Sequence, residues 1–202
     1  MIVIGVLALQ GGVAEHIYAT KKAAEQLGLT VKVVPVKRAN EIENIDAIIL
    51  PGGESTTIGK LAARTGLLKI LKKRIELDKI PVLGTCAGAI MLAKRVKDAV
   101  KGDISQPLLG VMNVQAIRNY FGRQKHSFEV DLRIPVLGDK PFRAVFIRAP
   151  VFDKVWGNAE VLAELNGLAV YVKEDSMHAT AFHPELTNDT RIHQLFLKEV
   201  KK

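Results

Sequence analysis

The sequence predicts an α/β fold: a mostly parallel central sheet flanked by helices, with an added antiparallel portion. Short apolar runs alternate with helical apolar spacing in the first half of the chain. Strict polar–apolar alternation marks Ser127–Ile134 in the second half. With 48% hydrophobic and 25% charged residues, the composition is that of an ordinary globular protein. Because the 202 residues contain no repeat or linker-like stretch, we expect a single domain over residues 1–202.

The first half contains strands separated by helices. The predicted strands are Ile2–Leu9, Val31–Val36, Ala47–Leu50 and Ile80–Leu83. The predicted helices are a stretch that carries Ile17, Ala23, Ala24 and Leu27 and stops at Gly28, then Leu61–Leu77, and a short run Ile90–Lys94. This alternation implies βαβ units and parallel strands covered on both faces. In such a sheet, chemistry is expected in the loops beyond the carboxyl ends of the strands.

The second half reads as antiparallel. Further strands are predicted at Arg143–Ile147, Val161–Leu165 and Leu168–Val172. The last two are separated by Asn166-Gly167, a pair typical of a hairpin turn. An amphipathic helix is predicted at Thr190–Lys202.

Charge and apolar content indicate a protein that binds neither nucleic acid nor membrane. The net charge of +8 (29 Lys and Arg against 21 Asp and Glu) is spread out, with small clusters at Lys72-Lys73-Arg74 and Lys201-Lys202. Aromatic residues make up only 5% of the chain and do not interleave with those clusters, as stacking platforms would. No apolar run is long enough to span a membrane, and Met1–Leu9 reads as a buried strand rather than a signal peptide. The lone cysteine, Cys86, excludes an internal disulfide and fits a cytoplasmic protein.

Cys86 is the strongest candidate for catalysis. It is the centre of Gly84-Thr85-Cys86-Ala87-Gly88, between a predicted strand and a predicted helix. Gly-x-nucleophile-x-Gly in that context is the pattern of a nucleophile elbow, a turn so tight that it pushes the central side chain out at the edge of the sheet. The helix that follows would stabilise a thiolate, and the Ala87 N–H would point toward a developing oxyanion. We therefore predict that Cys86 is a nucleophile.

A thiol nucleophile needs a base, and the base needs an orienting group. Of the five histidines, only His183 lies in a suggestive setting, Phe182-His183-Pro184-Glu185. In an extended chain a spacing of two places His183 and Glu185 on the same side, so that the carboxylate could fix one tautomer of the imidazole. An alternative is a metal site formed by His178, His183 and Glu185, although this spacing matches no zinc signature.

Three further features could line a binding site. The loop Pro51-Gly52-Gly53-Glu54-Ser55-Thr56-Thr57 follows a predicted strand, and could be a plain turn before a helix capped by Ser55 or Thr56. Alternatively, the Gly53 N–H completes an oxyanion hole opposite Ala87. Arg118 and Arg148 each stand at the end of a predicted strand, where a guanidinium could clamp a substrate carboxylate.

With Cys, His and Glu in this order on an α/β sheet, the sequence resembles the class I (triad-type) glutamine amidotransferases. The resemblance extends to the glutaminase subunits of pyridoxal 5′-phosphate synthase in six blocks that span most of the chain: Gly5–Gly11, Pro51–Thr57, Gly84–Gly88, Arg118–Gln124, Phe146–Pro150 and Phe182–Leu186. Two stretches are less typical, Val96–Pro107 and Tyr171–Thr180, and we expect them to be surface connections.

The resemblance implies hydrolysis of L-glutamine to L-glutamate and ammonia. It assigns Cys86 as the nucleophile that forms a glutamyl thioester, His183 as the base and then the acid, and Glu185 as its orienting group. The implied glutamine-binding positions are Gly53, Glu54, Ser55, Arg118, Ile147 and Arg148. Members of the family pass ammonia to a synthase subunit within a ring-shaped complex, need that subunit for appreciable activity, and use no metal or cofactor.

Two other functions fit the residues. An elbow cysteine can serve any acyl transfer, so a stand-alone cysteine amidase or peptidase is one alternative. A non-catalytic binding module with a basic surface is the other. Turnover of amides without a partner would favour the first, and an unreactive Cys86 with salt-sensitive nucleic-acid binding would favour the second.

Overall fold

The computed structural model describes residues 1–122 and 127–200. The strands are β1 (Ile2–Leu7), β2 (Val31–Val36), β3 (Ala47–Leu50), β4 (Val82–Thr85), β5 (Ala93–Asp98), β6 (Gly102–Asp103), β7 (Met112–Arg118), β8 (Phe128–Leu132), β9 (Phe142–Phe146), β10 (Val151–Val155), β11 (Glu160–Leu165), β12 (Leu168–Glu174) and β13 (Met177–Thr180). The α-helices are α1 (Val13–Gln26), α2 (Ser55–Arg64), α3 (Leu67–Glu76), α4 (Ala87–Leu92) and α5 (Arg191–Glu199), with single 3₁₀ turns at Ala39–Ile42, Pro135–Leu137 and Pro184–Leu186. Within this part of the chain, no helix is long and apolar enough to cross a membrane.

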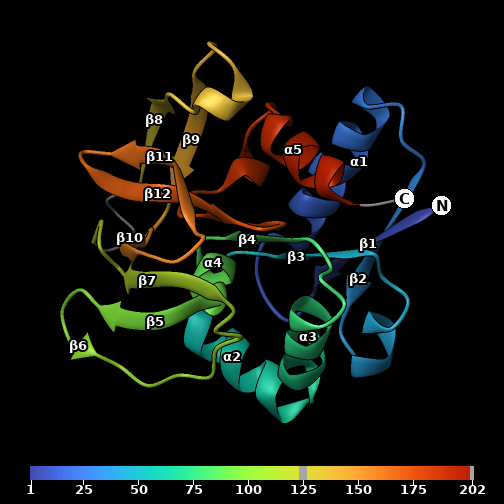
Figure 1. Ribbon diagram of the computed structural model, residues 1–202, viewed down its shortest axis with the longest axis horizontal. Helices are drawn as coiled ribbons and strands as arrows, with labels where there is room; N and C mark the ends of the chain where they lie inside the picture. Colours follow the sequence, from blue (N-terminus) through green and yellow to red (C-terminus); the bar gives the residue numbers. More distant parts are fainter. Residues whose placement is uncertain (123–126, 201–202) are drawn as a thin grey trace.

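One large sheet organises the molecule, in the order β2-β1-β3-β4-β13-β12-β10-β7-β5-β6, with β11 paired to β12. The pairs from β2 through β13 are parallel, whereas β12 and β10 pair antiparallel with their neighbours. Helices α1 and α5 cover one face of the parallel portion, and α2, α3 and α4 cover the other (Figure 1). A second sheet of β8 and β9 lies beside the antiparallel portion. The predicted fold class is confirmed.

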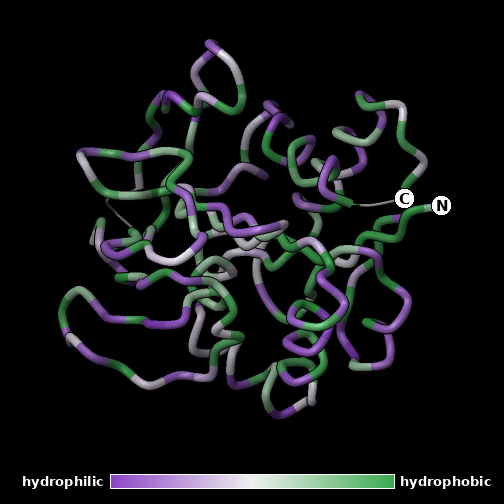
Figure 2. The backbone as a smooth tube through the Cα atoms, in the orientation of Figure 1, coloured by the Kyte–Doolittle hydropathy of each residue, from purple (hydrophilic) through white to green (hydrophobic). Residues whose placement is uncertain are grey.

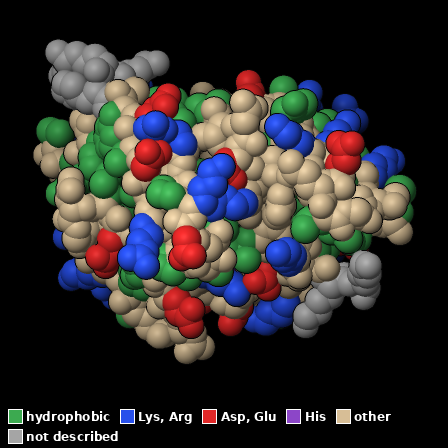
Figure 3. Space-filling model, turned by 90° about the horizontal axis from the view of Figure 1, so that it is seen from above, with side chains coloured by type: hydrophobic (Ala, Val, Ile, Leu, Met, Phe, Trp, Pro, Cys, Tyr) green, Lys and Arg blue, Asp and Glu red, His purple; other side chains and the backbone are tan. Residues whose placement is uncertain are grey.

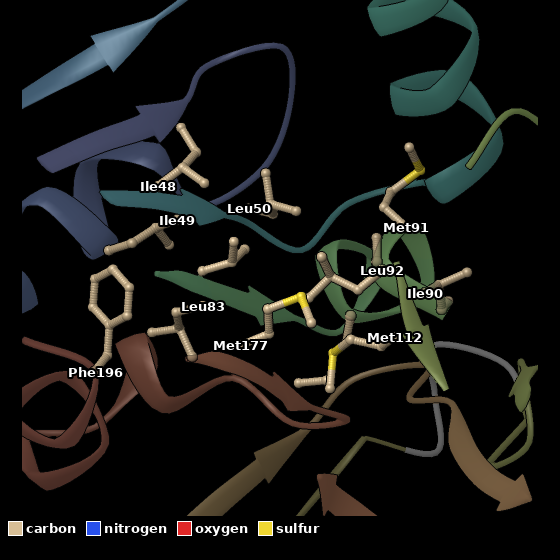
Figure 4. Close-up of a cluster of buried hydrophobic side chains, with 14 of the residues drawn as sticks. Ile48, Ile49, Leu50, Leu83, Ile90, Met91, Leu92, Met112, Met177 and Phe196 are labelled. Atoms are coloured by element: carbon tan, nitrogen blue, oxygen red, sulfur yellow. The ribbon is translucent and has the colours of Figure 1, made fainter. Parts of the chain in front are cut away.

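The core forms where both faces of the parallel strands are covered. Hydrophobic residues follow these strands through the centre of the molecule (Figure 2), and all four residues of β3 are buried. Side chains from β3, β4, β13, α4 and α5 contribute to one buried cluster (Figure 4). The full burial of β3 explains why its sequence is a continuous apolar run rather than an alternating one.

The hairpin prediction at Asn166-Gly167 is confirmed. Both residues have positive φ, 53° and 76°, and they connect β11 to β12. Asn and Gly tolerate this left-handed conformation better than other residues do, so the local sequence determines the turn.

Two helix predictions are wrong in their extent. The predicted helix Leu61–Leu77 is two helices, because α2 begins at Ser55 and ends at Arg64, and Gly66 (φ 76°) redirects the chain before α3. The predicted run Ile90–Lys94 stops at Leu92, where Ala93 takes extended geometry and begins β5.

The larger error concerns Tyr171–Thr180, which is not a surface connection. It forms the end of β12 and all of β13, and β13 is buried between β12 and β4. The other supposed connection, Val96–Pro107, contributes the end of β5 and the short strand β6. Among the sequence features, Arg123, Gln124, His126 and the Lys201-Lys202 end of the predicted last helix lie outside the described residues.

Candidate active site

The candidate site lies at the carboxyl edge of the parallel strands. Cys86 directly follows β4, and His183 comes three residues after β13. These two strands are parallel neighbours with Thr85 opposite Thr180, so their ends bring the two side chains to the same edge. The loop with Gly53 follows β3, the neighbour of β4 on its other side. This is the position predicted for chemistry in an α/β sheet.

The turn at Cys86 has the geometry of a nucleophile elbow. Its φ is +48°, a left-handed conformation that costs a non-glycine residue free energy. The backbone N–H of Cys86 donates to the Thr180 carbonyl at 2.8 Å, which anchors the turn to β13. A Cβ on Gly88 would lie 1.9 Å from the Leu50 carbonyl oxygen, and one on Gly84 would lie 2.8 Å from the Gly88 backbone. Both flanking glycines are therefore required for α4 to approach β3 and β4.

A cavity of about 280 Å³ opens at Cys86, and we call it the Cys86 cavity. Its lining includes Cys86, His183 and all six positions that the resemblance assigned to glutamine: Gly53, Glu54, Ser55, Arg118, Ile147 and Arg148. Gln10, Ile90 and Asn119 complete it, three residues that the sequence analysis did not single out. Ala87 begins α4 directly after Cys86 and is buried. The assignment of Gly53 and Ala87 as oxyanion donors stays a prediction.

His183 and Glu185 contact each other, but not through extended chain as predicted. Pro184 starts a 3₁₀ turn, and this turn brings Glu185 Oε1 to 2.7 Å from His183 Nδ1. The Glu185 side chain is almost fully buried, while that of His183 is 12% exposed toward the cavity. Because the carboxylate is an acceptor, Nδ1 carries the hydrogen and Nε2 is left for Cys86.

Burial alone would lower the pKa of His183, because it disfavours the charged imidazolium. Hydrogen bonding and charge from Cys86 and Glu185 outweigh burial and raise this pKa to about 10. Glu185 responds in the opposite direction: burial raises its pKa, but His16 and His183 together lower it below its ordinary value. Contact with Cys86 and with the Glu185 carboxylate therefore favours the imidazolium form of His183.

The His183 imidazole should titrate near pH 10, and Cys86→Ala should lower that midpoint because Cys86 is the strongest of the groups that raise it. Histidine-selective NMR across pH 5–11 measures both values, with His183→Asn to assign the resonance. A wild-type midpoint near 6.5 would contradict the ion-paired arrangement.

The metal alternative is not supported. The two ring nitrogens of His178 face Tyr171 and Glu199, at 2.8 Å and 3.9 Å, rather than His183. Burial lowers the pKa of His178 to about 4, so it is a neutral packing residue. In the described part of the chain, no group of three or more His, Cys, Asp or Glu side chains is placed to hold a metal ion.

Arg118 ends β7 and has several partners within the protein. Its guanidinium donates to Thr56 and Gln106 at 2.7 Å and 2.9 Å, and lies 3.3 Å from Glu54 and 3.2 Å from Asp98. The sequence did not identify Gln106 and Asp98 as partners of Arg118, because both lie in Val96–Pro107, the stretch expected to be a surface connection. Arg148, at the rim of the cavity, has a φ of +47°.

Glu54, not Ser55 or Thr56, caps the helix after the glycine pair. Its carboxylate accepts the backbone N–H groups of Thr56 and Thr57 at 3.1 Å and 2.7 Å. Burial opposes ionisation of Glu54, but hydrogen bonds from the Thr57 hydroxyl and from these two N–H groups lower its pKa overall. The Glu54 side chain therefore both caps α2 and pairs with Arg118.

Gln10 fixes the loop that carries Gly53. Its side-chain oxygen accepts the Glu54 N–H at 3.0 Å, and a Cβ on Gly53 would lie 3.2 Å from the same oxygen. Gly52 has no room for a side chain either, because a Cβ there would lie 2.4 Å from Cε1 of His183. Gln10 could have been identified as a site residue from the sequence. It follows a predicted buried strand and lies in a block that resembles the family.

The fold and these side chains together define an α/β protein with a cysteine at a nucleophile elbow. The chain belongs to the SNO glutamine amidotransferase family, which it matches over residues 6–202.

Relatives match the chain over its full length. It is similar to a protein from Staphylothermus marinus, with 51% identity over 203 residues, and to one from Saccharolobus solfataricus, with 52% identity over 198 residues; both are named pyridoxal 5′-phosphate synthase subunit PdxT. Each alignment covers 98% of both chains. A crystal structure of a glutamine amidotransferase has 46% identity and a TM-score of 0.83, again over 98% of both chains. A glutamine amidotransferase from Thermotoga maritima shares the fold, with 15% identity, a TM-score of 0.60 and coverage of 98% of this chain and 83% of that one.

Proposed function

We propose that this chain is the glutaminase subunit of pyridoxal 5′-phosphate synthase, with residues 1–202 forming one glutaminase domain. One observation carries the proposal: the Cys86 cavity joins a nucleophile-elbow cysteine and its histidine to all six expected glutamine-binding positions. Full-length relatives that are named as subunits of this synthase support the assignment.

The reaction is L-glutamine plus water to L-glutamate plus ammonia. The Cys86 thiolate attacks the side-chain amide carbon of glutamine, and backbone N–H groups of Gly53 and Ala87 stabilise the oxyanion. The His183 imidazolium gives its proton to the departing ammonia, which leaves a glutamyl thioester. Neutral His183 then takes a proton from water as the water attacks the thioester, and glutamate and Cys86 are released.

Glu185 fixes the tautomer of His183 throughout and stabilises its charged form. Glu54, Ser55 and Arg118 line the side of the cavity where the α-amino and α-carboxylate groups of glutamine would bind. Neither metal nor cofactor is needed, because thiol, imidazole and water supply every group that the balanced reaction uses.

The partner is the synthase subunit that consumes the ammonia, within a ring-shaped complex, and the location is the cytoplasm. The reduced state that Cys86 needs as a nucleophile supports this location. A surface on which Lys and Arg lie among Asp and Glu, as on the face in Figure 3, supports a function without nucleic acid.

Ammonia and glutamate release from L-glutamine tests the proposal, measured for the chain alone and with a synthase subunit added. We expect little release alone and a large rise with the synthase. Robust hydrolysis of varied amides without the partner would instead favour a stand-alone amidase. No turnover in either condition would contradict the proposal and favour the binding-module alternative.

A further inference from the structure

Behind the His183–Glu185 pair lies a buried polar chain. Glu185 Oε2, the carboxylate oxygen that His183 does not use, lies 3.3 Å from His16 Nε2. The same His16 nitrogen lies 3.1 Å from Thr85 Oγ1, and His16 Nδ1 lies 3.1 Å from His193 Nε2. His16, His193 and Thr85 are fully buried. They come from α1, α5 and β4, so three separate elements meet behind one carboxylate.

The carboxylate determines the tautomer of each imidazole. Burial lowers the pKa of both His16 and His193, the latter to about 3, so both rings are neutral and each has one N–H. A lone pair on His16 Nε2 would face the negative oxygen of Glu185, so Nε2 carries the hydrogen. His16 Nδ1 is then an acceptor, and His193 must donate from Nε2. This leaves His193 Nδ1 as the acceptor, and that atom has no partner among the described residues.

We infer that His16 is a positioning residue for the glutaminase reaction, held by His193, which keeps Glu185 charged and directed at His183. The inference rests on the proposed function. Within the described part of the chain Oε2 accepts no hydrogen bond, and the polar contact that the structure gives it is His16 Nε2 at 3.3 Å. Without the His16 N–H, this oxygen would be a buried, uncompensated negative charge, and the carboxyl would protonate more readily.

Other groups act on this carboxylate or on the histidines beside it. His183 lies on its reactive side, Glu15 on α1 and His193 on α5 act on His16, and Cys86 acts through His183. The first turn of α1 is adjacent too, since a Cβ on Gly12 would lie 3.4 Å from Glu185 Oε1. Among these, His16 is the group placed against Oε2, at 3.3 Å, so its loss should change the charge of Glu185 most directly.

Two amide variants of His16 make a matched test. In His16→Gln the side-chain nitrogen replaces Nε2 and can still place an N–H beside Glu185 Oε2, whereas in His16→Asn it replaces Nδ1 and cannot reach the carboxylate. With the synthase present, we expect His16→Asn to lower kcat about tenfold with little change in KM. The acid limb of the pH profile should move up by about one unit, because Glu185 then protonates at higher pH. His16→Gln should retain most of the wild-type rate and profile.

Two outcomes would overturn the inference. One is wild-type kcat and acid limb in His16→Asn. The other is an equal fall in kcat in both variants with an unmoved acid limb, which indicates a structural role alone. If His16→Asn does not fold, His193→Asn and His193→Gln make the same comparison at the next residue of the buried polar chain. We then expect a smaller shift of the acid limb.

Iodoacetamide alkylation of Cys86 against pH, on the chain without its partner, separates this inference from the proposed function. If the wild-type complex releases no ammonia that depends on Cys86, the proposed function fails, yet alkylation still reports the charge state of the site. If wild-type turnover is present and neither the acid limb nor the alkylation profile responds to His16→Asn, the inference alone fails.

Discussion

Replacement of Cys86 by alanine removes glutamine hydrolysis, with a fall in kcat of about 10⁴-fold or more. No other group in the proposed mechanism can form the thioester, since water attack helped by the remaining oxyanion donors is far slower. Ammonia and glutamate release in the presence of the synthase measures the effect.

The fold of Cys86→Ala should stay intact, which makes the loss interpretable. Alanine and cysteine experience similar strain at a φ of +48°. The deleted sulfur contacts His183 and lies 3.8 Å from the Ile147 carbonyl oxygen, both at the wall of the Cys86 cavity rather than in the core. Thermal unfolding and glutamine binding by calorimetry serve as controls. Wild-type turnover in a folded variant would exclude Cys86 as the nucleophile.

The substitution Gly88→Ala should cost about 3 kcal/mol of stability or more. Elsewhere in a helix this exchange gains about 1 kcal/mol, because alanine has the higher helix propensity. Here the new Cβ would lie 1.9 Å from the Leu50 carbonyl oxygen, and backbone atoms cannot move aside as a flexible side chain can. The steric clash therefore outweighs the gain in helix propensity, and the variant is less stable. Calorimetry should show a fall in Tm of about 10 °C.

Gly66→Ala is the matched control for this steric term. Its Cβ meets nothing within 4 Å, and the cost is the left-handed φ of 76° alone, about 1 kcal/mol. Equal losses of stability in the two variants would show that close approach of α4 to β3 is not what requires glycine at position 88.

The sequence was most informative where chemistry and local geometry coincide. The glycines around Cys86 are needed for the turn itself, so five consecutive residues predict both the elbow and its nucleophile. His183 and Glu185 were also found together, although the proline between them makes a turn and not the extended chain that was assumed. The six positions expected to bind glutamine were inferred from the resemblance, and the structure places all of them around one cavity.

Features created by long-range packing were missed. β13 is four residues long and contains a histidine and a threonine, so no apolar run distinguishes it from a loop. Only its neighbours on both sides make it a buried strand. The contact between His16 and His193 joins residues 177 positions apart, and neither stands in a recognisable motif. Gly66, in contrast, could have been read as a helix end from sequence alone.

The central place of β13 makes assembly of the site a late event in folding. Strand β4 and its cysteine are complete by residue 86, but the strand that delivers His183 must insert between β4 and β12. A chain still emerging from a ribosome would thus display a thiol without its base, orienting carboxylate or His193 support. Contacts between residues so far apart in the sequence form slowly. Until β13 pairs with β4, the edge of β4 that faces away from β3 stays unpaired. The architecture therefore delays the reactive ion pair until most of the chain has been made.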